Sequence, residues 1–224
     1  MLNVLDLFSG IGGFSLGLER TGGFRTVAFC EIDAYCQRVL RKHWPDVPIY
    51  SDVRTLPVIS CDVICGGFPC QPFSSAARGR HTAENLWPEM LCVIRRARPD
   101  WVIGENVARL DRVALDQVVL DLEAIGYTVA PTFEIPACAV GHDHWRPRLW
   151  ILAHADRDCK PSRAIDAEVA ELSRGDRDPG RLGAPHGLSG RMDRLHALGN
   201  AIVPQIPELI GRAILAAEAK SLAA

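Results

Sequence analysis

The chain is predicted to fold as an α/β domain, with a mostly parallel sheet covered by helices on both faces. Short apolar runs typical of buried strands alternate with stretches of helical periodicity along most of the sequence, and this alternation favours parallel strands joined by helices. Two apolar runs end directly in glycine clusters, at residues 10–13 and 66–67, as expected where a strand enters a tight turn. The length of 224 residues is enough for one such core.

Each predicted element ends at a recognisable breaker. A glycine turn separates the first strand from the first helix, and Pro45 and Pro99 follow the second and third helices. Gly126 stops the fourth helix, and the glycines at 66–67 close the third strand. The expected strands are residues 4–8, 26–30, 63–65, 101–104, 127–135 and 149–153, and the expected helices are residues 14–20, 35–43, 86–96, 115–125 and 207–219.

The composition of the chain changes after residue 155. Residues 156–190 are rich in Asp, Arg, Gly and Pro and poor in large apolar side chains, so they are predicted to be loop, with one short helix over residues 164–172. The expected organisation is a main domain over residues 1–155, a minimal loop-rich appendage over residues 156–190, and a segment over residues 191–224 that returns to the main domain.

Composition excludes several classes of protein. The apolar runs are far too short to span a membrane, and the N-terminus carries no basic, signal-like region. None of the eight cysteines forms a C-x-x-C pair, which favours reduced core thiols over a redox or zinc motif. The formal net charge of −2 gives no global basic footprint for nucleic acid. We therefore expect a cytoplasmic protein with no membrane partner.

The first glycine turn is a candidate ligand site. In open α/β sheets, ligands bind beyond the carboxyl ends of the strands, where glycines allow close approach and a helix N-terminus favours an anionic group. A tight turn without any ligand is the competing interpretation, because the spacing is not G-x-G-x-x-G. The candidate residues are Asp6, Gly10, Gly12 and Gly13 at the turn, Glu31 after the second strand for ribose hydroxyls, and Asp52 after a short third strand for an adenine amino group.

The loop after the third long strand is the most informative stretch of the sequence. It reads GGFPCQPFS, and Pro69 and Pro72 flank Cys70. The two prolines fix backbone angles and stiffen the turn that presents the thiol. A thiol exposed at a strand end, on the sheet edge that carries the glycine turn, is placed as a nucleophile rather than as a core residue.

With these motifs the chain resembles the cytosine-5 DNA methyltransferase family, in particular its short bacterial and phage-type members. The family's motifs occur in its order: DLFSGIGGF near the start, GGFPCQPFS, Glu105-Asn106-Val107, Arg146-Pro147-Arg148, and GNAIVP at residues 199–204. The resemblance implies a Rossmann-like, S-adenosylmethionine-dependent methyltransferase fold. It also implies transfer of a methyl group from that cofactor to carbon 5 of a cytosine in double-stranded DNA.

The resemblance assigns catalytic roles to five residues. Cys70 matches the nucleophile that adds to carbon 6 of the ring, which makes carbon 5 reactive. Glu105 matches the donor to ring nitrogen 3, and Arg146 and Arg148 match the paired arginines at the base or a phosphate. Asn106 is expected to hold the loop or contact the base. The cytosine must be flipped out of the duplex, with Gln71, Ser74 and Arg78 as the expected DNA contacts.

The resemblance also extends the cofactor site beyond the glycine turn. Phe8 is expected to stack on the adenine, and packing in the core is the competing interpretation for the aliphatic members of the set. The added cofactor residues are Phe8, Ile32, Val53, Gly67, Pro69, Leu86, Asn200 and Ile202.

Two departures from the family pattern carry expectations of their own. His144 stands where the family has Gln, in a His-Asp-His run near Cys138; the spacing offers no fourth ligand, so no metal is expected. The region available for target recognition, residues 156–190, is short, which predicts a short target or a protein partner that completes the surface. We expect a monomer. An RNA cytosine methyltransferase and a catalytically silent nucleic-acid binder are the alternatives.

Overall fold

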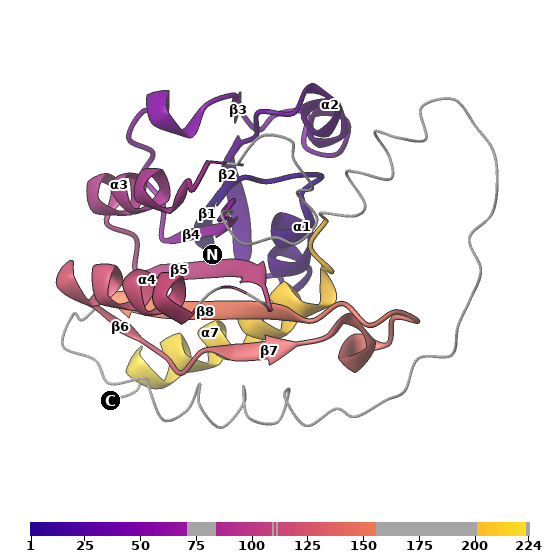
Figure 1. The fold of residues 1–224 in the computed structure, drawn as a ribbon. Helices are drawn as coiled ribbons and strands as arrows, with labels where there is room; N and C mark the ends of the chain where they lie inside the picture. Colours follow the sequence, from indigo (N-terminus) through magenta and orange to yellow (C-terminus); the bar gives the residue numbers. More distant parts are fainter. Residues whose placement is uncertain (71–83, 109, 111, 156–200, 223–224) are drawn as a thin grey trace, which may run out of the picture.

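A computed structural model describes residues 1–70, 84–108, 110, 112–155 and 201–222 of the chain (Figure 1). The expected helix over residues 164–172, and the whole of residues 156–190, lie outside them. The strands are β1 (Leu2–Leu7), β2 (Phe24–Cys30), β3 (Ile49–Tyr50), β4 (Val63–Gly67), β5 (Trp101–Val107), β6 (Tyr127–Val129), β7 (Phe133–Ile135) and β8 (Arg148–Ala155). The helices are α1 (Gly13–Arg20), α2 (Ala34–His43), α3 (Trp87–Ala97), α4 (Arg112–Ala124) and α7 (Gln205–Leu222), with short 3₁₀ turns η1 (Val53–Thr55) and η2 (Ala137–Val140).

The strands form one mostly parallel sheet, as predicted. Its order is β3-β2-β1-β4-β5-β8-β6, with β7 also paired to β8. The pairs from β3 to β5 are parallel, whereas β8 runs antiparallel to β5, β6 and β7. The parallel half therefore brings the carboxyl ends of β1, β2, β4 and β5 to one edge.

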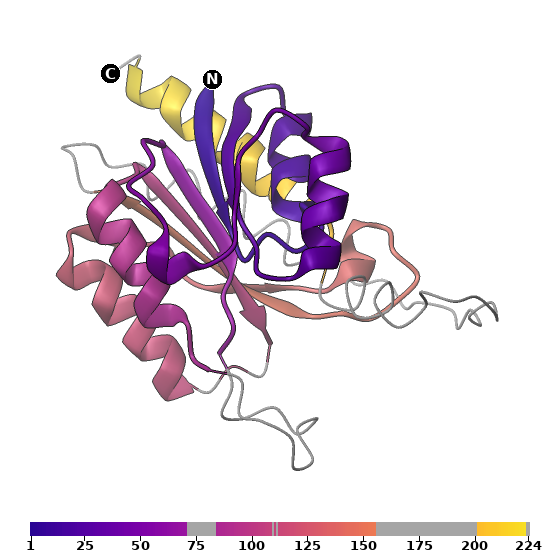
Figure 2. The same ribbon diagram turned by 90° about the horizontal axis from the view of Figure 1, so that it is seen from above.

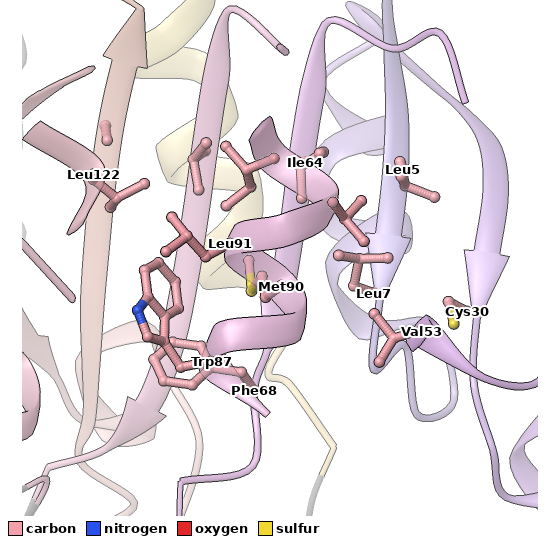
Figure 3. Close-up of a cluster of buried hydrophobic side chains, with 14 of the residues drawn as sticks. Leu5, Leu7, Cys30, Val53, Ile64, Phe68, Trp87, Met90, Leu91 and Leu122 are labelled. Atoms are coloured by element: carbon pink, nitrogen blue, oxygen red, sulfur yellow. The ribbon is translucent and has the colours of Figure 1, made fainter. Parts of the chain in front are cut away.

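Helices cover both faces of this sheet (Figure 2). Successive residues of a strand point to opposite faces, and both faces are apolar here. Val4, Val63 and Ile103 pack with α1 and α7 on one face. On the other face, Leu5, Ile64 and Val102 pack with α3 and α4 (Figure 3). Continuous apolar runs are typical of parallel strands buried on both sides.

Most observed strands extend a few residues beyond the expected bounds, and two of the differences have a local cause in the backbone. β1 ends at Leu7 because Phe8 adopts the left-handed region, with φ of 53°, which no strand residue does. The expected strand over residues 127–135 is two strands, β6 and β7, separated by a segment that contains Pro131. Proline has no N–H to donate to a neighbouring strand. The residues on either side of Pro131 therefore form two separate strands, each paired with a different part of β8.

The last helix packs back onto the first. A Cβ atom on Gly17 would lie 2.2 Å from the carbonyl oxygen of Pro204, and one on Gly13 would lie 2.4 Å from that of Ile202. Only glycine permits these approaches. They place the segment before α7 directly against the glycine turn and the start of α1.

Candidate functional site

The parallel register gathers the predicted site at one edge of the sheet. Leu7 at the end of β1 lies opposite both Cys30 and Gly66, and Gly67 at the end of β4 lies opposite Glu105. The glycine turn, Glu31, the cysteine loop and Glu105 all lie at these ends. Residues more than 90 positions apart in the chain are thereby brought to one edge.

The glycine turn has a strained and open backbone. Phe8 and Gly10 both have positive φ values, 53° and 54°, and a left-handed phenylalanine is uncommon and costly. The N–H of Gly10 donates to Glu31 Oε2 at 2.6 Å. Apart from its chain neighbours, no residue that the structure describes lies within 4 Å of the position where a Cβ of Gly10 would stand. The turn is therefore fixed by its neighbours while one side of it stays open.

Asp6 lies beneath this turn and holds it to β1. Its side chain is fully buried, and Ser15 Oγ of α1 donates to Asp6 Oδ2 at 2.7 Å. The hydroxyl of Ser9 donates to the Asp6 carbonyl oxygen at 2.6 Å. Burial raises the pKa of Asp6 to about 7, even though Ser15 favours the charged form. The structure thus places Asp6 as an anchor of the turn.

Glu31 fastens the turn to the end of β2. Its Oε1 accepts from the N–H of Asp33 at 2.7 Å, while its Oε2 accepts from Gly10. A carboxylate can accept about four hydrogen bonds, which leaves capacity for a ligand. Ile32 next to it is 76% exposed. Asp52, by contrast, caps η1 by accepting from the N–H of Arg54 at 2.9 Å.

Several predicted cofactor residues are also explained by packing. A Cβ on Gly12 would lie 2.6 Å from the ring of Trp44, and Gly13 is packed against Ile202. Val53 is buried in the core cluster that includes Leu56. These contacts support the packing interpretation at Val53 and give Gly12 and Gly13 a packing role as well, whereas Phe8 and Gly10 are partly exposed and Ile32 is exposed.

The cysteine loop is held by two backbone-directed hydrogen bonds. Asn106 Nδ2 donates to the carbonyl oxygen of Phe68 at 3.0 Å. The N–H of Leu86 donates to the carbonyl oxygen of Pro69 at 2.9 Å. Cys70 follows directly and is partly exposed. Asn106 and Leu86 therefore act here on the loop that presents the thiol.

An aromatic support beneath this loop was not predicted from the sequence. The rings of Phe68 and Trp87 lie 5.1 Å apart (Figure 3), and Trp87 Nε1 donates to Asp121 Oδ2 of α4 at 2.8 Å. Gln117 Nε2 donates to the other carboxylate oxygen at 2.8 Å. Trp87 could be recognised as an inward residue of its helix, but no sequence signal links it to Asp121.

Glu105 is a buried carboxyl group next to a cation. Its Oε1 lies 2.9 Å from Arg148 Nε. Burial raises the pKa of Glu105 to about 7, and the attraction of Arg148 and Arg146 only partly opposes this. A Cβ on Gly67 would lie 2.9 Å from Glu105 Oε2, so the glycine makes room for the carboxyl group. Glu105 can therefore carry a proton near neutral pH and release it.

Arg146 ties the site to the C-terminal segment. Its Nη2 donates to the carbonyl oxygen of Ala201 at 3.0 Å. Burial and the neighbouring charge of Arg148 lower the pKa of Arg146. Two guanidinium groups beside one carboxyl group leave a net positive site when Glu105 is protonated, which suits an electron-rich or anionic ligand.

The structure thus brings Cys70, Glu105, Asn106, Arg146 and Arg148 to the same sheet edge. Gln71, Ser74, Arg78 and Asn200 lie outside the described residues. Within the part of the chain that the structure describes, no group of three metal-ligating side chains is found. No described helix is both long and apolar enough to cross a membrane.

Comparison with known proteins identifies relatives of this arrangement. Residues 2–180 match the family model for C-5 cytosine-specific DNA methylases. The chain is 35% identical over 174 residues to the type II methyltransferase M2.BsuMI of Bacillus subtilis, covering 71% of this chain and 43% of that protein. It is 36% identical over 136 residues to M.HgiCII of Herpetosiphon aurantiacus, covering 56% and 31%. The chain thus spans less than half the length of these relatives.

Solved structures agree on the fold. A candidate DNA modification methyltransferase encoded within an E. coli prophage superposes with a TM-score of 0.59 at 25% identity, over 69% of this chain and 47% of that one. The Dnmt2 methyltransferase of S. pombe gives a TM-score of 0.63 at 19% identity, over 82% and 59%.

Proposed function

The chain belongs to the C-5 cytosine-specific DNA methylase family, and on this basis we propose that it transfers a methyl group from S-adenosylmethionine to carbon 5 of cytosine in DNA. The observation that carries the proposal is the pairing of Gly67 with Glu105. Cys70, whose thiol is partly exposed, follows three residues beyond Gly67 in the loop after β4, and Glu105 on the neighbouring strand β5 is a buried carboxyl group whose pKa is raised to about 7. A nucleophile and an acid at the same edge of the sheet are what addition to a cytosine ring requires.

Cys70 begins the reaction as a thiolate. Its sulfur forms a bond to carbon 6 of the ring, and the electrons of the 5,6 double bond become available at carbon 5. Glu105 supports this addition by giving its proton to ring nitrogen 3, which would otherwise accumulate negative charge. The carboxylate that remains is stabilised by Arg148, 2.9 Å away.

The end of the reaction restores the enzyme. Carbon 5 loses its proton to a base, the bond between sulfur and carbon 6 breaks, and the 5,6 double bond returns. Glu105 recovers a proton, and Cys70 leaves as a thiolate. No described side chain stands out as the base, so a water molecule is assigned this step.

The residues at the glycine turn fit the proposed cofactor. The open side of Gly10, the exposed Ile32 and the partly exposed Phe8 offer an apolar, uncrowded surface, while Glu31 keeps acceptor capacity for ribose hydroxyls. S-adenosylmethionine would supply an electrophilic methyl group. Phe8, Gly10, Glu31 and Ile32 would bind and orient it, and Ile202 would contact it from the C-terminal segment.

The proposed substrate is double-stranded DNA from which the cytosine has been extruded, since carbon 6 is inaccessible within a stacked duplex. Arg146 and Arg148 would bind the base or a backbone phosphate. The proposal also includes a short target sequence or, instead, a protein partner that completes target recognition, together with a monomeric catalytic chain and a cytoplasmic location.

The proposal is tested by methyl transfer from radiolabelled S-adenosylmethionine to unmethylated bulk DNA. Cys70→Ala should abolish incorporation while the melting temperature stays unchanged. Cys92→Ala is the matched control, because Cys92 is an exposed cysteine of α3, and it should retain full activity. Methyl transfer by Cys70→Ala at the rate of the unaltered chain would overturn the proposed function.

A further inference from the structure

The segment between η2 and β8 carries an exposed aromatic side chain. Trp145 is 62% exposed, whereas Trp87, Trp101 and Trp150 are almost fully buried. Removing an indole from water is favourable and its flat face suits stacking, so an exposed aromatic side chain is available to contact a partner. Nothing assigned to the methyl-transfer reaction uses this side chain.

The backbone of Trp145 extends beyond the sheet edge at which Glu105 lies. β8 pairs antiparallel with β5, and its first residue, Arg148, lies opposite Val107 at the end of β5. The residues that precede Arg148 therefore extend beyond the sheet edge that carries Cys70 and Glu105. Val107 is itself 44% exposed, so an apolar rim borders the charged site.

The backbone that presents Trp145 is fixed on its C-terminal side. Arg146 donates to the Ala201 carbonyl oxygen at 3.0 Å and accepts, through its own carbonyl oxygen, from the N–H of Ala137 at 3.3 Å. Pro147 restricts the next backbone angle, and Arg148 pairs with Glu105. An exposed indole on an anchored backbone loses little entropy when it binds.

The side chains near Trp145 in the sequence indicate which kind of partner it would bind. Two arginines follow it within three residues, and the side chain of His144 before it is 49% exposed. An aromatic face beside cations is typical of surfaces that stack on nucleobases and follow a phosphate backbone.

We propose that Trp145 stacks on an unstacked nucleobase of the DNA substrate, next to the position from which the cytosine is extruded. This inference rests on the proposed function. Extruding a base breaks its stacking with both neighbours, and a flat side chain at the rim of the site can cover one of the faces left open. Trp145 is thus a substrate-binding residue that favours the opened duplex over the intact one.

A duplex with one abasic position tests this without knowledge of the target sequence, because it offers unstacked bases permanently. Binding is measured by fluorescence anisotropy for this duplex and for the fully paired duplex of the same mixed sequence, at one salt concentration. The unaltered chain should prefer the abasic duplex. Trp145→Ala should raise the Kd for the abasic duplex by about tenfold, the size expected for one lost stacking contact, and should abolish the preference. Trp145→Phe should retain part of it.

Val58→Ala is the matched control. Val58 is also 62% exposed, but it lies in the segment between η1 and β4 and not in the segment that precedes β8. The Val58→Ala variant should bind both duplexes with the same Kd values as the unaltered chain. DNA should also quench the indole fluorescence of the unaltered chain more than that of Trp145→Phe.

Equal Kd values for Trp145→Ala and the unaltered chain on the abasic duplex would overturn the inference, as would equal quenching in the phenylalanine variant. The methyl-transfer assay separates this failure from failure of the proposed function. If the unaltered chain methylates DNA and Trp145→Ala has the same KM for DNA, only the stacking role is lost. If the unaltered chain binds through Trp145 yet transfers no methyl group, only the proposed function is lost.

Discussion

Asp6 and Glu105 belong to two different regions of the molecule. Asp6 lies beneath the glycine turn, and Glu105 lies on β5, next to the strand that leads into the cysteine loop. Burial raises the pKa of each carboxyl group to about 7. Asp6 is 0% exposed and accepts from Ser15, whereas Glu105 is 8% exposed and pairs with Arg148. Glu105 also lies at the carboxyl end of its strand, where ligands bind.

A raised pKa alone therefore does not identify a reacting group. Burial is sufficient to raise it, and Asp6 shows that a structural anchor can have the same value. What distinguishes Glu105 is a cation that stabilises its carboxylate after the proton has left, together with a position beside a partly exposed thiol. Substitutions at four residues of these two regions test this comparison.

Glu105→Gln should have the largest effect. Glutamine keeps the size of the side chain but cannot give a proton to ring nitrogen 3, so kcat should fall by about 10²–10⁴-fold, the usual contribution of a general acid. S-adenosylmethionine binding, measured by calorimetry, should change little. Loss of that binding would instead place Glu105 in the cofactor site.

Arg148→Gln should reduce kcat by a smaller factor, about 10–100-fold, and should also alter its pH dependence. Arg148 opposes the effect of burial on Glu105, so its removal should raise the pKa of Glu105 further. In the proposed mechanism the protonated form of Glu105 is the active one, so the unaltered chain should lose activity as pH rises through about 7. In the variant this loss should move to higher pH. A pH–rate profile that keeps its position would contradict the role of Arg148.

Glu31→Ala should act on the cofactor rather than on the base. The change removes the acceptor for Gly10 and the proposed acceptor for ribose, so the Kd for S-adenosylmethionine should rise by about tenfold, as for the loss of a hydrogen bond to a charged group. Calorimetry checks this. An unchanged Kd would exclude Glu31 from the cofactor site.

Asp6→Asn should have the smallest effect on activity, within about twofold, because the side chain lies beneath the turn and can still accept from Ser15. Its effect should appear in stability. A carboxyl group with a raised folded-state pKa stabilises the fold below its unfolded value of 3.8, and that contribution is lost as pH rises to about 7. Asparagine does not titrate, so urea unfolding of the variant should lose less stability between about pH 4 and pH 7. Equal slopes for both proteins would show that Asp6 is not protonated in the fold.

The sequence predicted those parts of the fold that local chemistry determines. Glycines and prolines marked the ends of the parallel strands and their helices, and the parallel arrangement then brought Cys70 and Glu105 to one edge. The left-handed backbone of Phe8 was not predictable, because only the surrounding turn forces it. The pairing of both β6 and β7 with β8, and the contact of Asp121 with Trp87, depend on tertiary packing between distant segments, which no local pattern records.

The covalent role of Cys70 can be tested directly by trapping the bond between its sulfur and carbon 6 of the cytosine ring. DNA synthesised with 5-fluorocytosine in place of cytosine blocks the release of Cys70. Carbon 5 then carries fluorine instead of the proton that a base must remove before the bond between sulfur and carbon 6 can break. After incubation with S-adenosylmethionine, nuclease digestion and mass spectrometry under denaturing conditions should find a methylated fluorocytosine nucleotide bound to the peptide that contains Cys70, and none in Cys70→Ala. If the chain methylates ordinary DNA but forms no such adduct, or forms it at another cysteine, Cys70 does not have the proposed covalent role.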